Sequence, residues 1–214
     1  MPRSDAPRAL TRRGLIAGGL GLGLLAGCRD EDRWNSIDVS GVLPDLSFTM
    51  TRAGDGKTVT EQDYRGRDVM LFFGYTLCPG VCPLTMANVA QVLDRLGPAA
   101  EGVSVLFVTV DPDRDTPGSL ARYVATFDPR VDGLRGTPNQ IEALTRRYRV
   151  THKVQKPRGE RPYTVIHGPS VYVFDAVGRA RFMVPKFYTA EADIDAVTQD
   201  MRRLIDTPIV SAAL

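Results

Sequence analysis

The sequence predicts an α/β fold in which a central mixed β-sheet is flanked by helices and preceded by an N-terminal β-hairpin. Two stretches, "DVMLFFGYT" (68–76) and "VSVLFVTVD" (103–111), are continuous apolar runs of strand length, as is typical of strands buried on both faces. A segment with helical spacing follows each run. The short connections between them imply right-handed crossovers and therefore a parallel central pair of strands.

The first predicted element is the hairpin. Leu46, Phe48 and Met50 alternate with polar residues, and "GDG" (54–56) supplies a turn directly after them. Alternation of period two before a glycine-containing turn is typical of two antiparallel strands. We therefore expect the domain to begin at about residue 43, with a hairpin that precedes the first buried strand.

Two helices are predicted to follow the two buried strands. The first begins at about Pro83 and stops at "GP" (97–98). Its apolar residues recur with helical spacing at Met86, Val89, Val92, Leu93 and Leu96. The second helix has Asp115 or Thr116 as its cap and Pro117 in its first turn.

The C-terminal half completes the sheet and its helical layers. Thr137 and Pro138 open a helix through "NQIEALTRRYRV" (139–150), and residues 170–184 form two strands around an Asp-x-x-Gly turn. An amphipathic helix over residues 189–205 ends the fold. This order of elements is the thioredoxin-like arrangement, and it predicts one thioredoxin-like domain over residues 43–214. In that fold the loop after the first central strand carries the reactive cysteine, and Cys78 lies there.

The N-terminus has the pattern of an export signal. Four arginines precede an uncharged stretch, "GLIAGGLGLGLLAGC" (14–28), which is short and glycine-rich for a membrane span of about 20 apolar residues. "LAGC" (25–28) resembles the lipobox of bacterial lipoproteins, and "TRRGLI" (11–16) is a partial match to a twin-arginine signal. An uncleaved membrane anchor is the alternative interpretation.

This pattern predicts a signal peptide over residues 1–27, a lipidated Cys28 and a polar tether over residues 28–42. The domain is then expected in the bacterial cell envelope, anchored by lipid to the cytoplasmic membrane and facing the periplasm. Residues 1–27 carry four Arg and one Asp, so the formal charge of +2 on the whole chain becomes −1 without them. No basic face for nucleic acid is predicted.

Cys78 and Cys82 are separated by one residue more than the C-x-x-C dithiol of a thioredoxin. Two side chains four residues apart on a helix point the same way. Free N–H groups and the helix dipole at a helix N-terminus favour the thiolate. Such a pair can exchange disulfides or bind a soft metal such as Cu(I) or Zn(II).

A histidine ligand would favour metal, and the chain has two candidates, His152 and His167. His167 precedes the C-terminal hairpin, and in a thioredoxin-like fold that loop returns beside the cysteine loop. A histidine of a surface loop is an equally good interpretation of it. His152 is interpreted as a strand or loop residue away from the thiols. Structural zinc would require a fourth ligand.

Three ordered motifs make the chain resemble the Sco/SenC copper proteins, which act in cytochrome c oxidase assembly. They are "FFGYTLCPGVCPLTM" with its C-x-x-x-C-P, "VTVDPDRDTPGSLARYV" with its D-P-x-R-D-T-P, and "YTVIHGPSVYVFDAVGR" with its histidine and Gly turn. The resemblance covers roughly the whole domain. It implies that Cys78, Cys82 and His167 bind copper as Cu(I) or Cu(II).

The resemblance also implies a function and partners. A copper metallochaperone would deliver copper to the binuclear site on a subunit of a respiratory oxidase. A thiol–disulfide reductase, the alternative, would keep the cysteines of that site reduced. Another periplasmic copper chaperone or a thiol reductant would be a further partner. A copper or redox sensor and a thiol peroxidase remain as other classes, and fold analogy alone does not select between them.

Two loops carry further residues of interest: the loop after the second buried strand and the loop around His167. Asp111 and Asp115 fall in the family's acidic loop; we expect Asp111 to orient a ligand or assist docking, and Asp115 to be a turn residue or helix cap. Ile166 stands where the family usually has Asp before the histidine. Pro169 falls where thiol oxidoreductases of the thioredoxin superfamily carry a cis-proline, which favours thiol exchange.

Overall fold

The computed structural model describes residues 33–155 and 163–207. The chain divides into two units at Trp34, and the described helices and strands all lie in the unit that begins there. The predicted signal peptide and Cys28 lie outside the described residues.

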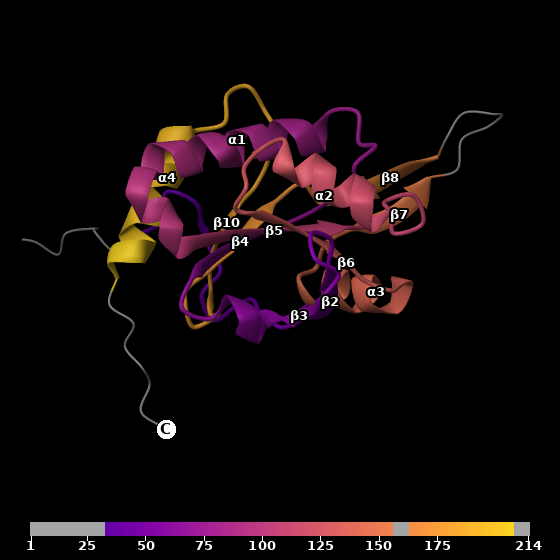
Figure 1. Ribbon diagram of the computed structural model, residues 1–214. Coiled ribbons are helices and arrows are strands. Elements are labelled where there is room, and N and C mark those ends of the chain that lie inside the picture. Colours follow the sequence, from indigo (N-terminus) through magenta and orange to yellow (C-terminus); the bar gives the residue numbers. More distant parts are fainter. Residues whose placement is uncertain (1–32, 156–162, 208–214) are drawn as a thin grey trace, which may run out of the picture. The chain divides into compact units, whose positions relative to one another are not determined.

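A mixed eight-stranded sheet forms the centre of the domain, in the order β1-β10-β9-β4-β5-β6-β2-β3 (Figure 1). Its middle pairs β4–β5 and β5–β6 are parallel, and the other pairs are antiparallel. The strands are β1 (Ile37–Asp38), β2 (Thr49–Arg52), β3 (Thr58–Thr60), β4 (Asp68–Gly74), β5 (Val103–Thr109), β6 (Val131–Arg135), β9 (Val171–Phe174) and β10 (Ala180–Val184).

The two central strands are completely buried. Each residue of β4 and β5 is inaccessible or nearly so, and the strands pair in parallel from Asp68 opposite Val103 to Gly74 opposite Thr109. A strand with helices on both sides has no face left for water, which explains the continuous apolar run. The predicted parallel central pair is confirmed.

Helices cover both faces of the sheet (Figure 1). The helices α1 (Val81–Leu96), α2 (Pro117–Ala125) and α4 (Ile194–Asp206) lie on one face, and α3 (Pro138–Arg147) lies on the other. Two short 3₁₀ helices are also present: η1 (Glu61–Tyr64) lies between β3 and β4, and η2 (Gly97–Gly102) lies between α1 and β5. The thioredoxin-like α/β fold with its N-terminal hairpin, β2–β3, is confirmed.

Capping side chains set where the helices begin. Thr116 accepts a hydrogen bond from the N–H of Ser119 at the start of α2, and Thr137 forms a reciprocal pair with Gln140 at the start of α3. The helix α1 begins two residues before the predicted Pro83, at Val81, and no side chain caps it. Its first N–H groups are therefore available to other acceptors.

Two features of the described fold differ from the sequence-based expectation. The strand β6 was not predicted, and neither was a separate two-stranded sheet made of β7 (His152–Gln155) and β8 (Thr164–His167). In Figure 1 these two strands lie at the end of the domain opposite α4.

The chain before the predicted domain boundary is also part of the fold. Residues 28–42 were expected to form a polar tether, but β1 pairs with β10 and Val39 is buried. The ring of Trp34 packs 4.9 Å from that of Phe182. The fully buried carboxylate of Asp200 accepts hydrogen bonds from the backbone N–H groups of Asn35 and Ser36, at 2.8 Å each. The described domain therefore begins at Trp34 and not at residue 43.

Candidate metal centre

The two predicted cysteines lie at the junction of β4 and α1. Cys78 is half-buried in the loop that leaves β4, and Cys82, the second residue of α1, is fully buried. They are not joined by a disulfide. Because α1 has no side-chain cap, the N–H of Cys82 is free to donate to the Sγ of Cys78, 3.5 Å away.

His167 is the last residue of β8, and its ring reaches the cysteines. Its Nε2 lies 3.3 Å from the Sγ of Cys82, and its Nδ1 lies 3.1 Å from the carbonyl oxygen of Gly168. A carbonyl can only accept, so Nδ1 carries the proton and the lone pair of the neutral ring is on Nε2, which faces the sulfur. The rings of Phe72 and Tyr75 each make a T-shaped contact with the imidazole, with centroids 5.8 and 5.9 Å away.

The structure thus brings together the three residues that the sequence predicted. The ligand atoms of Cys78, Cys82 and His167 all lie within 4.8 Å of one another. Across residues 33–155 and 163–207, no other group of three or more His, Cys, Asp or Glu residues is close enough to hold a metal ion. Two sulfurs and one imidazole are a soft donor set that suits copper, and they fall one ligand short of a closed structural zinc site.

The two thiols titrate very differently. The pKa of Cys78 falls from 9.0 to about 3, chiefly because the Cys82 thiol donates a hydrogen bond to its sulfur, with the backbone N–H groups of Gly80 and Cys82 adding to the effect. Burial and the neighbouring Cys78 thiolate raise the pKa of Cys82 above its ordinary value. At neutral pH the pair therefore holds one thiolate, on the more exposed sulfur, and one thiol.

Asp115 holds the cysteine loop, which the sequence did not predict. Thr116 caps α2, so the interpretation of Asp115 as the cap is wrong. The Asp115 carboxylate is completely buried and accepts hydrogen bonds from the Thr76 N–H at 3.1 Å, the Thr76 hydroxyl at 2.6 Å and the Thr109 hydroxyl at 2.5 Å. It therefore ties the loop that carries Cys78 to the end of β5.

Asp111 contacts the other side of the site. One of its oxygens accepts a hydrogen bond from the Tyr163 hydroxyl at 2.7 Å, and the other accepts from the Nε of Arg114. Asp111 does not belong to the ligand cluster, but Tyr163 directly precedes the strand that ends in His167.

His152 lies directly opposite His167 in the β7–β8 pair, a proximity that the sequence did not indicate. Its Nε2 donates to the carbonyl oxygen of Val110 at 3.1 Å, and His152 stays outside the ligand cluster. The cross-strand position is not visible in the sequence because the two histidines are 15 residues apart in the chain.

Three exposed apolar side chains stand close to the candidate ligands in the sequence. Leu77, Leu84 and Ile166 are 60%, 51% and 47% exposed, and each lies one or two residues from a candidate ligand.

Among the described residues no peptide bond is cis, so the Gly168–Pro169 bond is trans. The interpretation of Pro169 as a cis-proline of the thiol oxidoreductase type is therefore wrong.

No helix in the described part of the chain is long and apolar enough to cross a bilayer. The predicted lipid-bearing Cys28 lies outside that part, so the predicted anchor stays a prediction.

Comparison with known proteins gives a consistent result. The SCO1/SenC family model matches residues 45–206. Protein SenC of Rhodobacter capsulatus is 30% identical over 181 residues, covering 85% of this chain and 77% of that protein. The mitochondrial protein SCO2 homolog of Bos taurus is 35% identical over 150 residues, covering 69% of this chain. That match spans 55% of the bovine protein's own length.

Solved structures agree with this result. The copper-bound ScoI of Bradyrhizobium japonicum matches with a TM-score of 0.66 and 34% identity, covering 75% of this chain and 98% of that one. A SCO1/SenC family lipoprotein of Bacillus anthracis matches with a TM-score of 0.62 and 27% identity, covering 75% and 94%.

Proposed function

The chain belongs to the SCO1/SenC family, and on that premise we propose that it is a copper metallochaperone that helps to assemble the binuclear copper site of a respiratory cytochrome c oxidase. The observation that carries the proposal is the cluster of Cys78, Cys82 and His167, whose ligand atoms lie within 4.8 Å of one another. A copper-bound structure of a relative with 34% identity supports copper as the metal.

The cluster suits a carrier that receives and releases its cargo. Two thiolates favour Cu(I), and the imidazole adds a ligand that also suits Cu(II). Cys78 is already a thiolate, whereas Cys82 has to lose its proton when copper enters. Cys78 is half-buried and reachable at the surface, so ligand exchange with a partner would begin there.

We propose the predicted envelope location together with this function. A cleaved signal over residues 1–27 and a lipid on Cys28 would hold the domain at the cytoplasmic membrane, facing the periplasm. The lipoprotein among the structural relatives supports this arrangement. The recipient would be the oxidase subunit that carries the copper site, with another periplasmic copper chaperone or a thiol reductant as a further partner.

The test is a copper titration of the full-length chain carrying Cys28→Ser, so that Cys78 and Cys82 are the only thiols. The reduced protein, kept without oxygen, should bind one Cu(II) and show a thiolate-to-copper charge-transfer band. His167→Ala should weaken Cu(II) binding by about tenfold or more and alter the band. His152→Ala is the comparison variant, since it removes the histidine outside the cluster, and it should lower Cu(II) affinity much less than His167→Ala and keep the charge-transfer band.

A second function is favoured by the asymmetry of the thiols. A half-buried thiolate that is reachable from solvent, beside a buried thiol, is the arrangement of an attacking and a resolving cysteine. The Cys78 thiolate would attack a partner disulfide, and Cys82 would then displace the reduced partner and leave a Cys78–Cys82 disulfide. Cys82→Ser should trap a mixed disulfide with the partner. If copper only oxidises the dithiol and forms no stable complex, this reductase takes the place of the chaperone.

A further inference from the structure

The candidate ligands come from two sheets that share no hydrogen-bonded strand pair within the described residues. Cys78 and Cys82 follow β4 of the eight-stranded sheet, whereas His167 lies on β8 of the separate two-stranded sheet. On its C-terminal side His167 is followed by β9, whose first residue, Val171, pairs with Phe72 of β4. On its N-terminal side, β8 is positioned by contacts outside the eight-stranded sheet, and these contacts help to bring the His167 ring to 3.3 Å from Cys82.

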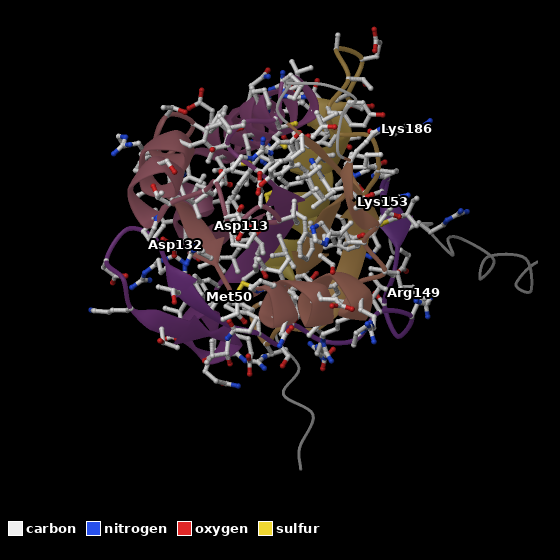
Figure 2. All side chains as sticks on the ribbon, turned by 90° about the vertical axis from the view of Figure 1, so that its right-hand side faces the viewer. Met50, Asp113, Asp132, Arg149, Lys153 and Lys186 are labelled. Carbon is white, nitrogen blue, oxygen red and sulfur yellow. The ribbon has the colours of Figure 1, made fainter. Side chains whose placement is uncertain are left out.

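The loop that leaves β5, residues 110–115, makes these contacts. At one end the Asp115 carboxylate binds Thr76 of the cysteine loop. At the other end the Val110 carbonyl accepts a hydrogen bond from His152 of β7. Figure 2 looks at the end of the domain that carries β7 and β8, and it labels Asp113 of this loop and Lys153 of β7.

Within the loop, Arg114 makes the contacts nearest to β8. Its Nη1 donates to the Tyr163 carbonyl at 2.8 Å, and its Nε donates to Asp111, which in turn binds the Tyr163 hydroxyl. Its guanidinium lies over the Tyr163 ring, 3.7 Å from the centroid. Tyr163 is thus held through its backbone, its ring and its hydroxyl, four residues before His167.

Arg114 also faces the residue that lines the other side of the histidine. Its guanidinium carbon is 5.6 Å from the centroid of the Tyr75 ring, and that ring makes a T-shaped contact with His167. The Tyr75 hydroxyl accepts a hydrogen bond from the N–H of Val165 at 3.5 Å. A planar guanidinium can hold two tyrosine rings, a carboxylate and a carbonyl at once, which a lysine or a glutamine cannot do.

We propose that Arg114 is a positioning residue of the metal centre: through Tyr163 and Tyr75 it sets the distance between His167 and the two thiols. The inference rests on the proposed copper function. Loss of Arg114 leaves the thiols and the Asp115 contacts intact and leaves β7 attached through His152. It loosens β8, so the imidazole ligand is affected and the dithiol is not.

The experiment compares Arg114→Gln with the parent, both full length with Cys28→Ser. Copper affinity is measured for Cu(II) and, by competition with a chromophoric chelator, for Cu(I). Because Cu(I) needs mainly the thiolates whereas Cu(II) gains from the imidazole, Arg114→Gln should lower Cu(II) affinity by about tenfold or more. It should lower Cu(I) affinity by less than about threefold. Tyr163→Phe, which keeps the ring and the carbonyl, should have a smaller effect on Cu(II).

The matched control is Arg130→Gln. Arg130 makes a partly buried pair with its near neighbour Asp128, as Arg114 does with Asp111, but it lies at the start of β6 and away from the cysteine loop. It should cost comparable stability and change neither copper affinity. Equal losses of Cu(I) and Cu(II) affinity in Arg114→Gln, or an unchanged Cu(II) affinity, would overturn the proposal.

A readout without metal separates this inference from the proposed function. In the metal-free protein, Arg114→Gln should speed amide hydrogen exchange at Val165 and Gly168, while exchange within β4 stays at the parent rate. If the parent binds no copper, the chaperone function fails and this exchange pattern still tests the role of Arg114. Uniformly faster exchange in β4 and β8 would count against positioning, since it would reveal a general loss of stability.

Discussion

Asp111 and Asp115 stand four residues apart and bind different halves of the candidate metal centre. Asp115 is sealed from water and accepts only from threonine and backbone donors on the cysteine side. Asp111 pairs with Arg114 and Tyr163 on the histidine side. A buried carboxylate is retained only when its oxygens are satisfied, so each aspartate fixes the donors around it.

A third buried carboxylate, Asp68, lies at the opposite end of β4. Burial and the nearby charge of Asp175 raise its pKa from 3.8 to about 6, against the opposing effects of the Ala176 N–H and Arg181. The folded chain therefore keeps a proton on Asp68 between about pH 4 and pH 6 that the unfolded chain has lost. The stabilisation of the folded chain by this bound proton is present at pH 4 and is lost as the pH rises through about 6.

We predict that Asp68→Asn stabilises the protein at pH 7 and not at pH 4. The asparagine keeps an acceptor and cannot ionise, so the gain at pH 7 is at most about 3 kcal/mol, the equivalent of two pKa units. Urea unfolding at both pH values measures it. Asp94→Asn, at an exposed position of α1, is the control. A gain that is the same at both pH values would show that ionisation is not its cause.

At the scale of single residues the sequence predicted the three candidate ligands that the structure brings together, and it missed the residues that support them. Cys78 and Cys82 are recognisable because their spacing is local and their place after a buried strand is predicted. Thr76 and Asp115 are 39 residues apart, and no local pattern connects a threonine with an aspartate across two strands. Tyr163 and Arg114 are separated by 49 residues and are missed for the same reason.

The strand β4 delivers the cysteine loop through a close contact at its last residue. A Cβ on Gly74 would lie 2.7 Å from the Cζ of Phe107 and 2.9 Å from the Cε1 of Phe72, and both rings are fully buried. Real Cβ atoms do not approach other atoms so closely. The glycine lets the strand end against the core before the chain turns toward Cys78.

Gly74→Ala should therefore destabilise the protein by about 1–3 kcal/mol, the usual cost of overpacking a core. It should also alter the reactivity of Cys78 toward a thiol reagent, since the displaced strand end carries the cysteine loop. Gly102→Ala, just before β5, is the control because its Cβ would meet nothing within 4 Å. Equal unfolding midpoints for the two variants would contradict the prediction.

The elements that the sequence did not predict are the short or half-buried ones. The strand β6 reads "VDGLR", in which a charge and a glycine interrupt the apolar residues and two positions are half-exposed. The strands β7 and β8 are mostly exposed and pair only with each other. Hydrophobic periodicity detects burial, and strands that bury little give no such signal. The long apolar strands and the capped helices carried the fold prediction.

In the domain as a whole, the N-terminal segment closes the end of the sheet remote from the metal centre. The Trp34 ring contacts Arg203 of α4. The last residues of α4, together with Asp68 at the start of β4, line a cavity of about 180 Å³. The cysteines follow the other end of the same strand. The seven residues of β4 put roughly 23 Å between the two ends.

A chain that starts at Leu43, the predicted boundary, should be less stable than one that starts at Arg33 by about 3 kcal/mol. It loses the packing of Trp34 and Val39 and leaves the Asp200 carboxylate buried without its backbone donors. Urea unfolding of the two chains measures the difference. Asp200→Ala in the longer chain should reproduce part of the loss, whereas identical midpoints would show that the segment adds nothing.

Because Asn35 and Ser36 are hydrogen-bonded to Asp200, the stretch of chain between Cys28 and the folded domain is shorter than the sequence predicted. If Cys28 carries the proposed lipid, the chain from Cys28 to Asn35 can span at most about 24 Å, whereas the chain from Cys28 to the predicted boundary at Leu43 could span about 50 Å. The volume that the domain can sweep shrinks with the cube of this length, by about tenfold. A partner in the membrane then has to contact the surface around Cys78 and His167 within a narrow range of heights above the bilayer. Lateral diffusion in the membrane, more than movement of the linking segment, would bring the two proteins together.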